Sequence, residues 1–321
     1  MTYPDIYFEP FWGKLNAALE KDGRYGEFVY EDENGSALYP YILRPVEILL
    51  DGEQYYDTIT PYGFNGPVIL ECREGAREQL AAAFEKAFDA HCREQHIVAE
   101  YVRFCPWLYN DRDFGRFYIL RDNGKTFGID LTGDFFYEEL NSNRRKKIRK
   151  AIRSGVTAEF DFEGKSVPEF LRLYGLMAER NQIDQSYRFS EAFIRQTLAA
   201  CGENAFFING RYEGKLIDSG LYLLSGQYIH AHLLGNDDAY FGLNADQILI
   251  YEACRWGKEH GKKTLHLGGA HTESLIRYKN EFTRKCVYDF RIGTKIRNPE
   301  VYERLVRAKG EANPDFFPAY R

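Results

Sequence analysis

The sequence predicts an α+β protein built from two units, because strand-like and helix-like stretches follow one another through both halves of the chain. At 321 residues the chain is long enough for two domains of ordinary size, each with its own core. Hydrophobic residues make up 44% of it and charged residues 28%, which is typical of a globular rather than a disordered chain. In the first unit, the patterns predict strands at 26–31 and 39–49, a helix at 76–96 and a strand at 97–104.

The second unit is expected to begin near Phe127. A helical stretch at 135–155 places Ile148, Ala151 and Ile152 on its inner face, and Gly155 suits the position that follows a helix. The other predicted elements are strands at 126–131, 156–162 and 263–268 and helices near 168–181 and 190–201. A three-stranded meander is predicted at 205–235, with turns at Gly210/Gly214 and Ser225-Gly226. A further helix is predicted from Asn244 to Gly261, with Asn244 as the N-cap and Gln247 three residues after it.

Composition excludes several classes of protein. The net charge of −6 argues against a general nucleic-acid-binding surface, so no DNA partner is expected. No apolar run approaches the ~20 residues that span a bilayer, and the N-terminus does not resemble a secretory signal. The six cysteines lack C-x-x-C or zinc-like spacing, which predicts free thiols and no metal site. We expect a cytoplasmic protein without a membrane span.

One short segment departs from the acidic average. Residues 144–153, "RRKKIRKAIR", hold seven Lys/Arg and no acidic residue. At a helix N-terminus, Arg144 and Arg145 together with free N–H groups would form an anion site for the phosphate of a nucleotide, a coenzyme or RNA. The alternative is a solvated basic face. An RNA-binding protein that uses this segment is a third hypothesis, and its affinity would fall steeply with salt.

A lysine lies on the apolar side of a second predicted helix. If this helix begins near Thr272, then Tyr278 and Lys279 share a face with apolar residues. The lysine either extends past the edge of the core or points its ammonium into a cleft. The preceding Gly268-Gly269 pair would let the backbone approach a ligand closely, which favours a site.

Two further stretches contain candidate site residues. In the loop "TPYGFNGP", Tyr62 and Phe64 could either wall a substrate cleft or pack within a turn. His230 and His232, two apart on one strand, are either proton acceptors or hydrogen-bonded strand residues. His271, just after the glycine pair, is another candidate base.

Three stretches, taken together and in their order along the chain, resemble the FemABX peptidyltransferases and their N-acyltransferase relatives. "NSNRRKKIRKAIRSGV" is similar to the family's R-x-x-I-R-K-A-x-x-x-G-V signature, and "ITPYGFNGP" is similar to its S-P-Y-G-Y-x-G-P loop. "NADQILIYEACRWGKEHGKKTLHLGGAHTESLIRYKNEF" resembles the closing run, in which a helix and a strand lead to Gly-Gly and L-x-x-F-K-x-x-F. The resemblance covers about residues 57–305.

This resemblance implies two tandem GNAT-like domains, each a mixed sheet flanked by helices. The first would span 1–125 and be completed by the C-terminal segment 296–321, and the second would span 126–295 and hold the donor. The implied activity is acyl transfer to an amine without a prosthetic group. The donor would be aminoacyl-tRNA or acyl-CoA, which the residues do not decide, although no Gly-rich acetyl-CoA loop is present. The acceptor would be a cell-wall peptidoglycan precursor or an amino sugar, either small or nucleotide-linked.

The resemblance also implies roles for particular residues. Lys279 would hold the acyl carbonyl or its developing oxyanion, as the lysine of F-K-x-x-F, with Tyr278 in place of the phenylalanine. Peptidoglycan-modifying members of the family tend to have an aspartate, which serves as a general base, shortly after the Gly-Pro of the loop. In this sequence Val68, Ile69 and Leu70 follow the Gly-Pro, and Glu71 is the first carboxylate after them. Other implied residues are Arg144 and Arg145 for phosphate, Gly268 and Gly269 for the donor, and Tyr62, Phe64 and Tyr278 for substrate. The rival hypothesis is a non-catalytic, ligand-binding relative.

Overall fold

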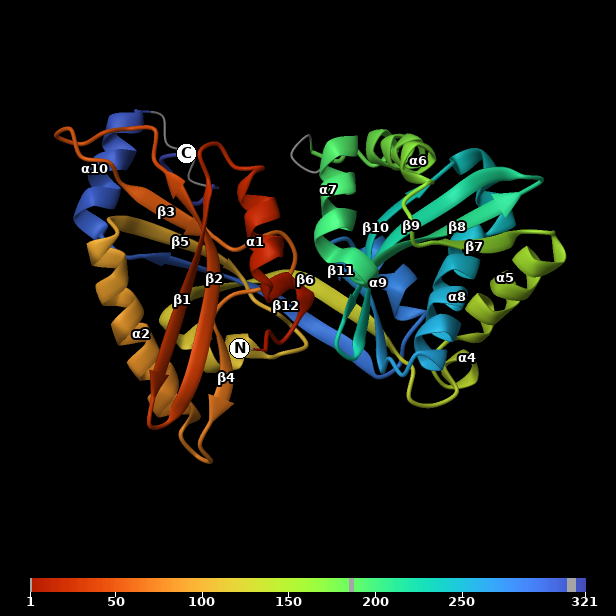
Figure 1. Ribbon diagram of the computed structural model, residues 1–321, viewed down its shortest axis with the longest axis horizontal. Coiled ribbons are helices and arrows are strands. Elements are labelled where there is room, and N and C mark those ends of the chain that lie inside the picture. The colour runs from red at the N-terminus through yellow and green to blue at the C-terminus, as the bar shows by residue number, and fades with distance from the viewer. Residues whose placement is uncertain (1, 185–187, 311–315) are drawn as a thin grey trace. The chain divides into compact units, whose positions relative to one another are not determined.

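The computed structural model describes residues 2–184, 188–310 and 316–321 and has an α+β fold (Figure 1). It contains two compact units. The first comprises Met1–Asn123 with Asp289–Arg321, and the second comprises Gly124–Tyr288. Two strands, β6 (Ile119–Asp130) and β12 (Cys286–Ile296), each contribute residues to both units.

The first unit is a mixed sheet with helices. Strands β1 and β2 pair antiparallel, as do β2 and β3, β2 and β4, and β5 and β12, whereas β3 and β5 are parallel. Phe84 and Phe88 of α2 pack on Phe28 and Tyr39 of the sheet and form the core. Besides β6 and β12, the elements are η1 (Ile6–Phe8), α1 (Pro10–Ala17), β1 (Arg24–Asp32), β2 (Gly35–Pro45), β3 (Tyr56–Ile59), β4 (Val68–Cys72), α2 (Arg77–Glu94), β5 (Ile97–Arg103), α3 (Asn110–Phe114), η2 (Gly115–Phe117) and α10 (Pro299–Lys309).

The second unit is a sheet in the order β6-β11-β10-β9-β8-β7, in which only β10 and β11 are parallel. Its strands and helices, besides β6 and β12, are α4 (Phe135–Glu138), α5 (Ser142–Arg153), β7 (Thr157–Asp161), α6 (Val167–Arg180), α7 (Glu191–Cys201), η4 (Gly202–Asn204), β8 (Ala205–Tyr212), β9 (Lys215–Ser225), β10 (Tyr228–Asn236), η5 (Asp238–Leu243), α8 (Ala245–Glu259), β11 (Thr264–Ala270) and α9 (Glu273–Asn280).

Neighbouring residues of β8 show how helices cover both faces of this sheet. Successive side chains of a strand point to opposite faces. Phe206 lies 5.0 Å, between ring centroids, from Trp256 of α8, and Phe207 lies 5.0 Å from Phe170 of α6. Helices α8 and α6 therefore cover opposite faces, and α5 packs beside α8.

The predicted helix at 135–155 is wrong in one respect, because the structure has two helices there. Asn141 caps α5 by accepting a hydrogen bond from the Arg144 backbone N–H, so a new helix starts at Ser142. The buried positions of α5 are Arg144, Ile148 and Ala151, spaced i, i+4, i+7. Ile152 is 52% exposed, contrary to the prediction, because Arg144 rather than Ile152 completes the inner stripe.

Other local predictions are confirmed with changes. The three strands of the meander are β8, β9 and β10, but Gly210 lies within β8, and the first turn is formed by Glu213 and Gly214, both with positive φ. Asn244 occupies the position before α8 in a left-handed conformation and makes no side-chain capping bond. Gly155 follows α5 with φ +84°, as expected of a residue after a helix. All six cysteines are free.

Candidate functional site

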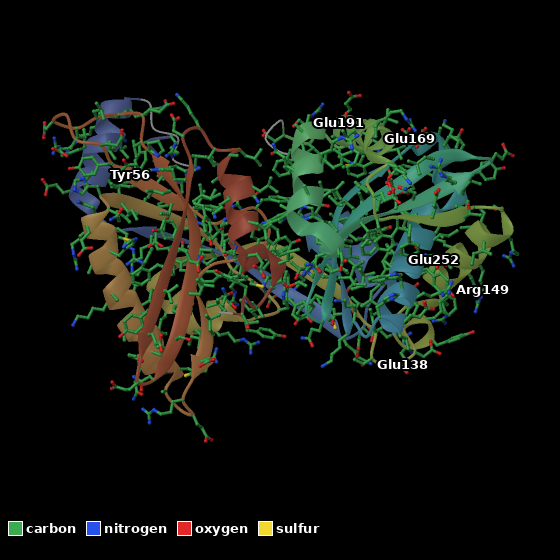
Figure 2. The ribbon with its side chains drawn as sticks, in the orientation of Figure 1. Tyr56, Glu138, Arg149, Glu169, Glu191 and Glu252 are labelled. Carbon is green, nitrogen blue, oxygen red and sulfur yellow. The ribbon has the colours of Figure 1, made fainter. Side chains whose placement is uncertain are left out.

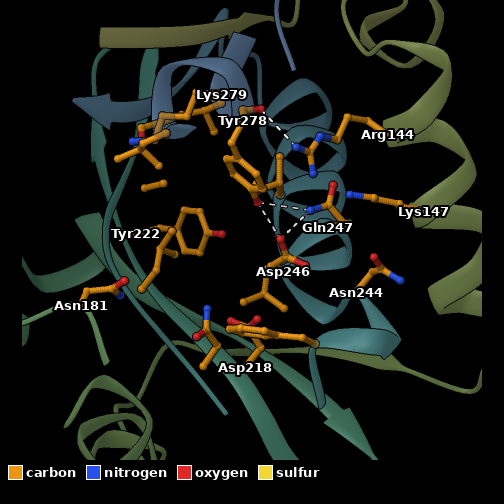
Figure 3. A pocket seen from close by; sticks show the side chains of 18 of the residues that line it. Arg144, Lys147, Asn181, Asp218, Tyr222, Asn244, Asp246, Gln247, Tyr278 and Lys279 are labelled. Atoms are coloured by element: carbon orange, nitrogen blue, oxygen red, sulfur yellow. Dashed lines mark hydrogen bonds between the residues drawn. The ribbon is translucent and has the colours of Figure 1, made fainter. Parts of the chain in front are cut away.

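The second unit encloses a cavity of about 630 Å³ (Figure 3). Apolar side chains of β10, β11 and α8 form part of its wall. Charged and polar side chains reach it from six elements, namely Arg144 and Lys147 of α5, Arg180 of α6, Asp218 and Tyr222 of β9, Asn236 of β10, Asp246 and Gln247 of α8, and Tyr278 and Lys279 of α9. A concave, largely apolar space with a few convergent polar groups is typical of a ligand site.

Lys279 lies at one side of this cavity. Its ammonium donates hydrogen bonds to the backbone carbonyls of Leu267 and Gly269, each over 2.7 Å. Burial lowers the pKa of Lys279 to about 8. An ammonium has three N–H donors, and the two carbonyls use two of them. The third is available to a ligand in the cavity, so of the two orientations that the sequence left open, the structure has the one that faces a cleft.

The strands beside Lys279 explain how the two carbonyls reach it. Strands β10 and β11 pair in parallel only from Tyr228↔Thr264 to His230↔His266. The register of β11 on β6 then shifts between His266 and Gly269, and Gly268 has φ +76°. A left-handed residue inside a strand is tolerated best as glycine, and the bend that it allows directs carbonyls toward the ammonium.

Arg144 holds α9 against α5. Its guanidinium lies over the rings of Tyr278 and Phe282, at 4.1 and 4.4 Å from their centroids, and its Nε is 3.0 Å from Glu281 Oε2. Its Nη2 donates to the Tyr278 carbonyl over 3.2 Å, whereas the buried Nη1 has no hydrogen-bond partner. Arg144 thus positions the segment that carries Lys279.

Two carboxyl groups line another part of the cavity. The hydroxyl of Tyr278 donates to Asp246 Oδ2 over 2.6 Å, and the Gln247 amide donates to the same oxygen. Asp218 is only 5% exposed, and burial, followed by the nearby charge of Asp246, raises its pKa well above the usual value. The buried hydroxyl of Tyr222 makes no hydrogen bond. The cavity therefore combines cations at some of its walls with carboxylates at others.

Other predicted residues of the second unit lie beside the cavity rather than in its wall. Arg145 donates to the Leu140 carbonyl and lies over the ring of Tyr137. Most of the basic segment faces solvent, including Arg149 (Figure 2). His271 is exposed just after β11. Among the cations of the segment, the structure brings Arg144 and Lys147 to the cavity.

Of the strand histidines, His230 and His266 are buried within the sheet, and His232 is half-buried. The Nδ1 atoms of His230 and His266 lie 3.5 Å apart, and burial lowers the pKa of His266 well below its usual value. Burial lowers the pKa of His232 to about 3, so this side chain is a weak proton acceptor at neutral pH. These properties favour the interpretation of His230 and His232 as packed strand residues.

The three remaining predicted residues belong to the first unit. Phe64 is buried, with its ring centroid 5.0 Å from those of Trp107 and Phe290. The Tyr62 carbonyl accepts a hydrogen bond from the Trp12 indole over 2.7 Å. Glu71 is exposed on β4. All residues that line the cavity of the second unit come from that unit, so these three are not among them.

The sequence analysis missed the acidic part of the cavity. Asp218 lies within "LIDSGLYLL", residues 216–224, where it is the one charged residue of an apolar strand. Aspartate is rarely fully buried unless it is paired, so a single aspartate in an apolar strand could have indicated a functional residue. Asp246 and Gln247 resembled ordinary residues of a first helical turn, and nothing local distinguished them.

Comparison with known proteins identifies the class. Residues 142–280 match the family model described as an acetyltransferase (GNAT) domain. The chain as a whole has a FemABX-like fold of two GNAT-like domains. The crystal structure of FemX superposes with a TM-score of 0.71 at 12% identity, covering 94% of this chain and 94% of that one.

Two other solved structures share the fold. The L-PGS of Bacillus licheniformis matches with a TM-score of 0.53 at 16% identity, over 91% of this chain and 90% of that one. A tandem GNAT protein from the clavulanic acid biosynthesis pathway matches with a TM-score of 0.51 at 10% identity, over 87% and 85% of the two chains. No curated protein matches the sequence.

Within residues 2–184, 188–310 and 316–321, no group of three or more His, Cys, Asp or Glu side chains could hold a metal ion. In the same part of the chain, no helix is both long and apolar enough to cross a membrane.

Proposed function

We propose that the protein is an N-acyltransferase, which moves an acyl or aminoacyl group from an activated, phosphate-bearing donor to a primary amine. The observation that carries this proposal is the Lys279 ammonium, held at the cavity by the carbonyls of Leu267 and Gly269. When an amine attacks an ester or thioester, the carbonyl oxygen gains negative charge. A fixed cation in a site that excludes water stabilises this charge by several kcal/mol.

The position of α5 supports a donor that carries phosphate. Lys147 and Arg144 are near the start of this helix and line the same cavity as Lys279. Basic side chains beside the first N–H groups of a helix attract phosphate. Both charged tRNA and acyl-CoA satisfy this requirement, so the donor is left for the experiment to identify.

For the acceptor, we propose a cell-wall peptidoglycan precursor or an amino sugar, free or nucleotide-linked, and a cytoplasmic site of action. The support is the FemABX-like fold together with the motif resemblance. The open volume of about 630 Å³ is in the range of pockets that bury most of a small ligand.

The proposal is tested by incubating the purified full chain with pairs of donors and amines. The donors are acetyl-CoA, longer acyl-CoAs and charged tRNA, and the amines are UDP-linked peptidoglycan precursors and glucosamine. Mass spectrometry should detect an amide formed from one pair. Donor binding without any amide would favour the non-catalytic relative, and neither binding nor amide formation would overturn the donor assignment.

A further inference from the structure

We infer that Asp218 and Asp246 form a subsite for a primary ammonium group in the same cavity as Lys279. The inference rests on the proposed function, because that function supplies amines as ligands. It adds a recognition element that lies apart from the cation that stabilises the acyl carbonyl.

Asp218 is a buried carboxyl without an ion pair among the described residues, although Arg180 lines the same cavity and its charge opposes the rise in the pKa of Asp218. It lies on β9, 5% exposed, and forms no ion pair with any residue that the structure describes. Its neighbour Asp237 differs, since Asp237 lies 3.7 Å from Arg172 and 3.5 Å from Lys215. A buried charge without a partner is costly, and an organic cation in the cavity would remove that cost.

Asp246 is held in place for the same task. The hydroxyl of Tyr278 and the amide of Gln247 both donate to its Oδ2, which fixes the carboxylate at the start of α8. Two more oxygens at the cavity, Gln247 Oε1 and the Tyr222 hydroxyl, are buried without hydrogen-bond partners. In Figure 3, the side chains of Asp218, Tyr222 and Asp246 surround one region of the pocket.

The chemistry of this region selects the kind of ligand. Asp246 and the neutral oxygens attract a cation, and a cation bound beside Asp218 would favour the ionised form of this carboxyl, whose pKa burial raises. A primary ammonium has three donors and is compact, so it can bond to both carboxylates and one neutral oxygen at once. The described residues here include no third acidic, histidine or cysteine ligand for a metal ion.

Two ligands of the proposed reaction could bring this ammonium. It is either the α-ammonium of an aminoacyl group on the donor or the amine of the acceptor. Two probes separate these sources. The donor probe is 3′-alanylamino-3′-deoxyadenosine, a stable amide analogue of an aminoacyl ester, and the acceptor probe is a lysine-containing tripeptide. Each is compared with its derivative N-acetylated at the tested amine.

The experiment measures the dissociation constant of each probe by calorimetry, for the full chain and for the variants Asp218→Asn and Asp246→Asn. The control is Asp238→Asn, because Asp238 is exposed and lies outside the cavity wall. We expect at least a tenfold loss of affinity for one probe in both cavity variants, a comparable loss on N-acetylation, and no change in the control.

Two results decide whether Asp218 and Asp246 form an ammonium subsite. If one probe shows these losses, the subsite is supported and its source is named. If neither probe binds more weakly after acetylation or in the cavity variants, the subsite is overturned. Thermal melting of each variant verifies folding, and Asp218→Asn retains the shape of the side chain. The outcome is independent of amide formation, so failure of the subsite and failure of the transferase proposal are distinguishable.

Discussion

A buried arginine of the first unit and the charged groups around Lys279 in the second unit are satisfied in different ways. In the first unit, the guanidinium of Arg297 forms ion pairs with Glu100, Glu85 and Asp89, and its side chain is 1% exposed. In the second unit, Lys279 makes hydrogen bonds only to carbonyls and Asp218 makes no ion pair, within the residues that the structure describes.

This difference separates structural charge from functional charge. A buried ion pair whose members satisfy each other contributes to a defined fold and leaves nothing for a ligand. Charges that share a cavity without neutralising each other lie in the low-dielectric environment that strengthens their interaction with a bound molecule. We propose that the cavity of the second unit carries the chemistry, and four changes test this contrast.

The largest effect is expected from Arg297→Met in the first unit. Removal of Arg297 leaves the carboxylate of Glu100 buried without its cation, whereas Glu85 keeps Lys295, and the loss should lower the free energy of unfolding by about 3–5 kcal/mol. Urea unfolding measures this value. The exposed i, i+4 pair of Arg195 and Glu191 gives the matched control, because Arg195→Met should cost less than about 1 kcal/mol. Equal losses in the two variants would contradict the contrast.

Lys279→Met should reduce turnover by about 10²- to 10³-fold, since it removes the cation that stabilises the developing oxyanion. Turnover is measured with the donor and amine identified by the product screen. The control is Lys165→Met, because Lys165 is exposed outside the cavity wall and should retain full activity. A Lys279→Met enzyme within threefold of the parent would exclude the assigned role.

The pKa of Lys279 predicts how turnover depends on pH. Burial lowers this pKa to about 8, so the ammonium is present below that pH and is lost as the pH rises through it. Turnover that depends on the cation should fall by about tenfold for each pH unit well above 8. Lys279→Arg stays protonated throughout, so whatever activity it has should lack this alkaline decline. A decline of the same shape in both enzymes would assign it to another group.

The smallest effect is expected for the stability of Asp218→Asn. The pKa of Asp218 is raised in the folded state, so this state binds its proton more tightly than the unfolded chain does. Ionisation of Asp218 therefore costs stability, most of all above the raised pKa, and this cost disappears as the pH falls to the ordinary pKa of an aspartate in the unfolded chain. Asp218→Asn should be at least as stable as the parent at pH 8, and this advantage should shrink at lower pH. A variant less stable at every pH would show that the carboxyl is structural.

Much of the fold was predictable because its signals are local. The period of apolar residues identified α2 and α8, and glycines with positive φ marked the ends of α5 and α8. The break before α5 was missed, because the Asn141 cap lies inside a stretch with continuous helical propensity. The burial of Arg144 was also missed, since it depends on the Tyr278 and Phe282 rings, which are far along the chain.

The candidate site was predictable only in part. Lys279 was found because a lysine at an apolar helical position is unusual and because the surrounding motif resembles a known family. Asp218 and Asp246 were not, because their meaning depends on the fold that brings β9 and α8 to one cavity. Residues of a charged site on different elements share no sequence spacing, so their joint role becomes visible only in three dimensions.

The central claim is that the Lys279 cavity of the second unit binds the acyl donor. The most direct measurement is thermal melting of the parent, Lys279→Met and Lys165→Met with acetyl-CoA, longer acyl-CoAs and charged tRNA. A ligand at a hundredfold excess over its dissociation constant stabilises the native state by about 2.7 kcal/mol. We predict that one donor raises the melting temperature of the parent and of Lys165→Met, and that this shift is reduced or absent in Lys279→Met. No shift with any donor, or the same shift in all three proteins, would contradict the account.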